Sequence, residues 1–170
     1  AFHLDLNSKT QIYNQLQSIE ILYHKGLYSQ AEKLCRKVLV IAKEKELFAH
    51  ILSANEILIE LLSKQFKYQE VVDLIDEAKV FHGKLTNFRD IQSHTMKAYQ
   101  EQWKLGYART DEEGQVLKSY IDHKEINNPN YPQSKRAEMY LLGLNLTYAF
   151  FINDLEKMIS LSVKMNTLYE

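Results

Sequence analysis

Glycine and proline are scarce in this chain of 170 residues, and their scarcity restricts the fold more than any other sequence feature. The sequence holds 5 Gly and 2 Pro, whereas a protein of average composition and this length would hold about 20 of the two together. A β-rich fold needs a turn residue about every ten positions. The chain cannot supply those turns, so the sequence predicts an all-α protein.

Apolar residues recur at the spacing of one helical face along nearly the whole chain. Ile12, Leu16 and Ile19 are separated by four and three positions, as a buried helical face requires. Further stripes of this kind predict eight helices. Capping patterns predict that helices begin at residues 8–11, 110–113 and 153–156, and Gly26 is expected to end the first helix.

The eight predicted helices pair into four antiparallel hairpins. They cover residues 8–45, 47–83, 87–124 and 133–170. The second helix of each pair is expected to begin 40, 43 and 44 residues after the previous one, at Tyr28, Tyr68, Asp111 and Leu155. Such a period is typical of a solenoid, in which each unit buries its apolar face by stacking on its neighbours. We therefore expect one helical repeat domain over residues 1–170.

The turn of the first hairpin carries a more specific pattern. From Gly26 to Leu34 the sequence GLYSQAEKL resembles the turn of a tetratricopeptide repeat, in which a Gly, an aromatic two positions later and a small Ala three positions after that recur. The second hairpin keeps the aromatic Tyr68 but replaces the Gly by Phe66. The resemblance implies a right-handed superhelical array of about four hairpins. The repeats here are longer than the usual period of about 34 residues, so we expect longer helices. A helical-hairpin array of another repeat family is the alternative.

Charge is balanced along the chain, with 21 basic and 22 acidic residues interspersed. Without a basic cluster we expect no nucleic-acid partner and no anionic membrane surface as a partner. The unbroken apolar runs, such as residues 38–42 and 148–152, are too short to span a bilayer. The chain begins with Ala rather than Met, which suggests a fragment of a longer protein, and with no targeting pattern we expect a cytoplasmic location.

The sequence contains no arrangement of residues that predicts catalysis. None of the 6 His residues forms a pair at the spacing of a helical metal site, and no Gly-rich phosphate loop is present. Asp73, Asp76 and Glu77 lie opposite an apolar stripe, so we expect a solvated helix face. Cys35 lies on such a stripe and is expected to be buried. We therefore predict a protein that is not an enzyme and has no cofactor or metal ion.

In tetratricopeptide arrays the first helix of each pair lines a concave groove, and the resemblance implies groove positions in this chain. They are Tyr13, Leu16, Glu20, Tyr23, His24, Ser53, Glu56, Glu60, Lys64, Met96, Tyr99, Trp103, Tyr107, Tyr140, Thr147 and Phe151. Tyr99, Trp103 and Tyr107 follow each other at four-residue steps, and aromatic residues with a polar tip are enriched at binding hot spots. A stripe at this spacing is more often core between repeats, so both interpretations stay open.

The predicted array favours a scaffold that binds a protein or a peptide. The alternative is a helical regulatory or sensor part of a larger signalling or transcription protein. The last helix carries Met158, Leu161, Met165 and Leu168. Because the end of a solenoid exposes an apolar face, we expect a further repeat or self-association to cover this helix.

Overall fold

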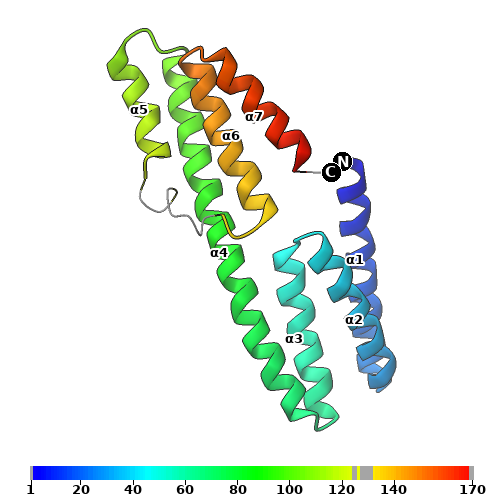
Figure 1. Ribbon diagram of the computed structural model, residues 1–170. Helices are drawn as coiled ribbons and strands as arrows, with labels where there is room; N and C mark the ends of the chain where they lie inside the picture. Colours follow the sequence, from blue (N-terminus) through cyan, green and yellow to red (C-terminus); the bar gives the residue numbers. More distant parts are fainter. Residues whose placement is uncertain (1, 124–125, 127–131, 169–170) are drawn as a thin grey trace. The chain divides into compact units, whose positions relative to one another are not determined.

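A computed structural model describes the backbone of residues 2–123, 126 and 132–168, and side chains from residue 9 onward. Within these residues the chain forms seven α-helices and no strand, so the all-α prediction is confirmed (Figure 1). The helices are α1 (Phe2–His24), α2 (Tyr28–Glu44), α3 (Phe48–Lys64), α4 (Tyr68–Leu105), α5 (Asp111–Ile121), α6 (Lys135–Phe151) and α7 (Leu155–Thr167). They belong to two compact units, Ala1–Leu85 and Thr86–Glu170.

Most predicted helix boundaries are confirmed. Helices begin at all four expected positions, namely Tyr28, Tyr68, Asp111 and Leu155. The predicted start at residues 8–11 is wrong, because α1 already begins at Phe2. None of residues 2–8 is Gly or Pro, so a helix can extend through them at little cost.

The fourth and fifth predicted helices are a single helix, and the boundary predicted between residues 83 and 87 is wrong. α4 runs for 38 residues with Gly83 inside it. An interior Gly costs a helix only about 1 kcal/mol. The apolar stripe also continues across it without a change of register, through Phe81, Leu85 and Phe88. Of the segment between the third and fourth predicted hairpins, residues 125–132, only Ile126 and Pro132 lie among the described residues.

Four of the turns between helices share one backbone conformation. In each, a residue with positive φ follows the helix. The backbone N–H of the residue after it donates to the carbonyl five positions earlier, as Leu27 donates to the Leu22 carbonyl at 3.0 Å. The residues with positive φ are Gly26, Glu46, Phe66 and Asn153. This conformation costs a residue other than Gly about 1–2 kcal/mol. The same turn therefore forms at Glu46, Phe66 and Asn153 without a Gly, and we attribute this to packing of the flanking helices.

In the first unit α2 packs against both α1 and α3, and the three helices lie side by side (Figure 1). Ala31, Cys35 and Val38 are fully buried on α2. The small Ala31 side chain lets the helices approach closely. Cys35 Sγ donates a hydrogen bond to the Ala54 carbonyl of α3 at 3.1 Å, so the prediction that Cys35 is a core residue is confirmed.

A polar network joins α2 to the turn before α4. The Glu32 carboxylate accepts hydrogen bonds from Lys67 Nζ at 2.9 Å, Gln65 Nε2 at 2.9 Å and Arg36 Nε at 3.0 Å. Burial alone would raise the pKa of Glu32, but these three donors together hold it below its ordinary value of 4.5. The ionised carboxylate therefore stabilises this unit.

Because the folded-state pKa of Glu32 is lowered, its stabilising effect is present above about pH 4.5 and is lost as the pH falls through the folded-state value. We expect Glu32→Gln to lower the free energy of unfolding by about 1 kcal/mol at neutral pH. Urea unfolding at about pH 7 and about pH 3 should show this difference shrinking in acid. The exposed Glu20→Gln serves as the control, and an equal loss at both pH values would contradict the assignment.

The second unit contains the part of α4 from Thr86 onward together with α5, α6 and α7. Its core includes Ala98, Ile126 and Leu144. The Thr95 hydroxyl lies 3.3 Å from the Tyr140 carbonyl of α6, which ties α4 to α6. α6 in turn packs against α5 and α7 (Figure 1).

The last helix has no fully buried residue. The apolar residues that were expected on its outer face, Met158, Leu161, Met165 and Leu168, are half-buried. The exposed apolar residues are Leu155, Ile159 and Val163 instead. Coverage of α7 by a further repeat or by self-association stays a prediction, and these three side chains are the ones that it would cover.

Candidate functional site

The second unit has a hollow of about 660 Å³ with aromatic walls, named the aromatic groove below. It is lined by Tyr99, Gln102, Trp103, Gly106, Tyr107, Thr147 and Phe150. A hollow of this volume is within the range of ligand sites in proteins, about 300–1,000 Å³. Tyr99, Trp103 and Tyr107, the stripe singled out in the sequence, therefore come together with two residues of α6.

The end of α4 positions one wall of the aromatic groove. Gly106 ends the helix with a φ of +74°, a conformation that suits Gly. Two residues later the N–H of Ala108 donates to the Phe151 carbonyl at 3.1 Å. This bond holds the segment after α4 against the end of α6, and the rings of Tyr107 and Phe150 lie 5.1 Å apart.

A glycine on α6 makes room for the next aromatic residue. A Cβ added at Gly143 would lie 3.1 Å from the Tyr99 hydroxyl, closer than a methyl group and an oxygen normally approach. The Thr147 hydroxyl bonds to the Gly143 carbonyl at 2.9 Å. Tyr99 therefore lies closely over α6 and forms the inner wall, whereas Trp103 is 91% exposed at the rim.

No residue that lines the aromatic groove carries a charge. The nearest charged neighbours in sequence, Glu101 and Lys104, pair with each other at 2.8 Å. The groove offers ring faces together with hydroxyl, amide and indole groups that can donate hydrogen bonds. Its chemistry suits an uncharged ligand surface.

The other predicted groove positions are distributed differently. Met96 is exposed but does not line the aromatic groove, and Tyr140 is half-buried against Phe88 and Gln92. In the first unit Tyr13, Glu20, His24, Ser53, Glu56, Glu60 and Lys64 are exposed, and Leu16 and Tyr23 are half-buried. Of these, Glu56 lines a separate hollow of the first unit.

The predicted groove position Phe151 is wrong. Phe151 is 1% exposed, whereas its neighbour Phe150 is 40% exposed and lines the aromatic groove. Successive residues of a helix point about 100° apart, so an error of one position moves a ring from the groove to the core. Sequence reasoning also missed Gln102 and Gly106; the Gly just after the apolar stripe was a usable signal for the end of α4.

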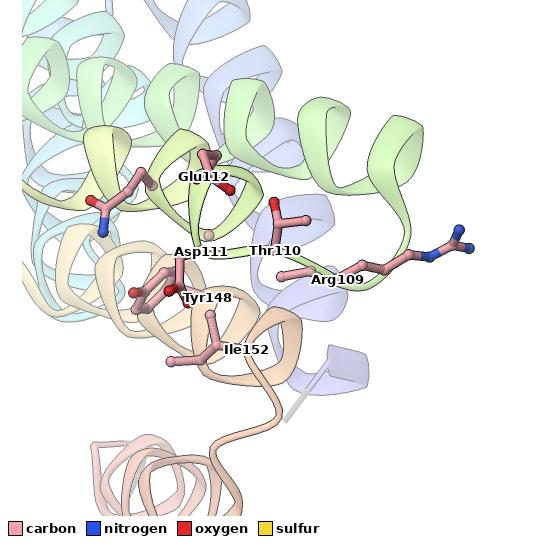
Figure 2. Close-up of a pocket in the computed structure, with 9 residues that line it drawn as sticks. Arg109, Thr110, Asp111, Glu112, Tyr148 and Ile152 are labelled. Carbon is pink, nitrogen blue, oxygen red and sulfur yellow. The ribbon is translucent and has the colours of Figure 1, made fainter.

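A second hollow of about 790 Å³ lies at the start of α5, where Figure 2 shows Arg109 extending away from the other labelled side chains. The Thr110 hydroxyl accepts from the Glu113 N–H at 3.3 Å, and the Glu113 carboxylate accepts from the Arg109 N–H at 2.7 Å. The Thr110 bond confirms the predicted N-cap, whereas Glu113 accepts from the residue before the cap and not from the N–H of Thr110 itself, so the capping box is formed only in part. The Thr110 hydroxyl of this hollow is thus engaged in capping the start of α5.

Among the described residues, the carboxylates and imidazoles are not grouped into a reactive cluster. Asp73 and Asp76 are exposed as predicted, and Glu77 pairs with Lys43 at 2.6 Å. The rings of His94 and His123 lie 4.6 Å apart. In the part of the chain that the structure describes, no three His, Cys, Asp or Glu residues are grouped as metal ligands would be. The same part contains no helix that combines the length and apolar character needed to cross a bilayer.

Comparisons with models of known protein families, with curated proteins and with solved structures find no match to this chain.

Proposed function

We propose that this chain is a protein- or peptide-binding scaffold built of tetratricopeptide-like hairpins, and that the aromatic groove is its binding site. The observation that supports this most is the exposure of Trp103 beside Tyr99, Tyr107 and Phe150 in one hollow. An exposed Trp next to further exposed aromatic rings leaves a large apolar area in water. Burying that area against a partner would be favourable.

The chemistry of the groove favours binding over catalysis. Its lining has ring faces and neutral hydrogen-bonding groups, but no acid, base or activated nucleophile. The neutral lining also favours the surface of a protein or peptide over a polyanion such as nucleic acid. Neither a cofactor nor a metal ion has a role in this proposal.

Trp103→Ala tests the proposed site. We expect it to weaken the binding of peptides selected on the full chain from a random displayed library by about thirtyfold, the effect of losing a hot spot of about 2 kcal/mol. Trp103 is the only Trp of the chain, so its fluorescence can follow binding to the unchanged protein. Affinities of the variants can be measured by calorimetry.

Val116→Ala is the matched control, because Val116 is also exposed but lies outside the groove lining. It should leave the affinity unchanged, and both variants should unfold at the same temperature as the parent. Selected peptides that bind Trp103→Ala as tightly as the parent would exclude the aromatic groove as the site.

A further inference from the structure

The first two hairpins can be aligned residue by residue through their shared turn. Gly26 and Phe66 occupy the same position of that turn, and α2 and α4 begin two residues later, at Tyr28 and Tyr68. Each residue of the first hairpin therefore has its counterpart 40 positions later in the chain.

The second hairpin has a hollow of about 450 Å³ between α3 and α4, named the α3/α4 groove below. It is lined by Leu52, Asn55, Glu56, Ile59, Ile75, Ala78, Lys79 and His82. All of these residues belong to the first unit. Ile75 on its wall is 41% exposed.

The counterparts of this lining in the first hairpin are covered. They are Ile12, Gln15, Leu16, Ile19, Cys35, Val38, Leu39 and Ala42. Gln15 and Leu16 are half-buried and the other six are buried. α3 packs against both α1 and α2, and Cys35, the counterpart of Ile75, donates to the α3 main chain at Ala54. The surface that α3 covers in the first hairpin thus stays open in the second.

Asn55 in the open groove has unused hydrogen-bonding capacity. Its side chain is 1% exposed, and neither Oδ1 nor Nδ2 has a partner among the described residues. A buried amide without partners is unfavourable and rare in proteins. Turning the amide toward the groove that Asn55 lines would therefore break no existing hydrogen bond.

The next counterpart along the chain indicates what Asn55 would bind. When α3 and the end of α4 are aligned through the residues with positive φ that follow them, Phe66 and Gly106, Asn55 corresponds to Thr95, which is fully buried. Its hydroxyl donates to the Ile91 carbonyl of its own helix at 2.9 Å and also lies 3.3 Å from the main-chain carbonyl of Tyr140 on α6, the helix that covers this face of α4. At this position, a polar side chain can bond to the backbone of the covering helix.

We propose that the α3/α4 groove is a docking site for an amphipathic helix of a partner protein, with a main-chain carbonyl of that helix accepting from the Asn55 amide. Leu52, Ile59 and Ile75 would receive its apolar face. This proposal rests on the proposed binding function and adds the kind of element that binds, an amphipathic helix. It does not depend on the aromatic groove.

The rim of the groove favours an exchangeable partner over a permanent part of this chain. Leu16, Leu39 and Ala42 of the first hairpin are replaced by Glu56, Lys79 and His82, and these charged or polar groups are exposed to water when the groove is empty. A polar rim around an apolar centre is typical of interfaces that form and dissociate. A complementary helix would carry basic residues toward Glu56, whereas Lys79 already pairs with Asp76 at 2.8 Å.

The test uses a fluorescently labelled synthetic peptide with the sequence of α3, Phe48–Lys64, because α3 fills the corresponding groove of the first hairpin. We expect fluorescence anisotropy to show saturable binding to the full chain. Ile75→Glu should weaken it at least tenfold, and Asn55→Leu by about threefold to tenfold, the share of one hydrogen bond. Val72→Glu, exposed on α4 but outside the groove lining, should have no effect.

Two outcomes would overturn the proposal. One is that the α3 peptide shows no saturable binding, or that its binding is the same in the Ile75→Glu variant as in the parent chain. The other is a dimer in analytical ultracentrifugation that Ile75→Glu converts to a monomer, which would make the occupant a second copy of this chain. Trp103→Ala should leave binding of the α3 peptide unchanged, so failure of this proposal and failure of the aromatic groove are distinguishable.

Discussion

A Leu58→Ala variant is expected to lose about 2–5 kcal/mol of the free energy of unfolding, the usual cost of a cavity left by a buried Leu. Leu58 lies at the middle of α3 and is 0% exposed. α3 has 17 residues, and a helix of that length is only marginally stable in water by itself. Its contacts with α2 are therefore expected to stabilise it, and a cavity there should affect the whole first unit.

Urea unfolding followed by circular dichroism measures this loss, and hydrogen exchange locates it. We expect faster amide exchange in α2 and α3 of the variant, because each helix of a stacked array is stabilised by its neighbours. Val72→Ala is the control, since an exposed substitution changes stability by no more than about 0.5 kcal/mol. A loss below about 1 kcal/mol in Leu58→Ala would mean that α3 does not pack as described.

Local sequence signals predicted the helix starts because those signals act locally. The start of α5 depends on Thr110 and Glu113, whose side chains bond to backbone groups within four positions. The end of α1 follows from Gly26 and its positive φ. Such features require no knowledge of the tertiary fold.

The continuity of α4 and the repetition of the turn do not follow from the preferences of single residues. Gly83 is compatible with either a helix or a break, and the apolar stripe that continues across it favours one helix. Glu46 and Phe66 adopt a left-handed conformation that neither residue prefers. Contacts between the flanking helices determine the backbone of these turns, so residue preferences alone concealed a repeated turn.

The candidate sites were only partly predictable for the same reason. The spacing of Tyr99, Trp103 and Tyr107 identified the stripe, but whether it was groove or core depended on how closely α6 approaches α4. Gly143 sets that approach at Tyr99. Asn55 lies in sequence on the apolar stripe of α3, between Ile51 and Leu58. Its unpaired amide becomes evident only once α2, α3 and α4 are in place.

Cysteine reactivity should separate the covered groove of the first hairpin from the open groove of the second. Burial raises the pKa of Cys35 to about 12 from an ordinary value of 9.0. The difference of about 3 leaves roughly a thousandfold less reactive thiolate at about pH 8. Because Cys35 is also inaccessible, we expect alkylation by iodoacetamide to be at least that much slower in the folded chain than in urea.

The matched position is Ile75, the counterpart of Cys35 in the open groove. In a Cys35→Ala background, the thiol introduced by Ile75→Cys should react within about tenfold of its rate in urea, since the side chain at this position is 41% exposed. Mass spectrometry after timed quenching measures both rates. Cys35 can react only when α3 moves away from the groove of the first hairpin. The alkylation rate of Cys35 therefore reports how firmly α3 covers α1 and α2. Comparable protection of both thiols would show that the α3/α4 groove is already covered in the free protein, which would contradict an open docking site.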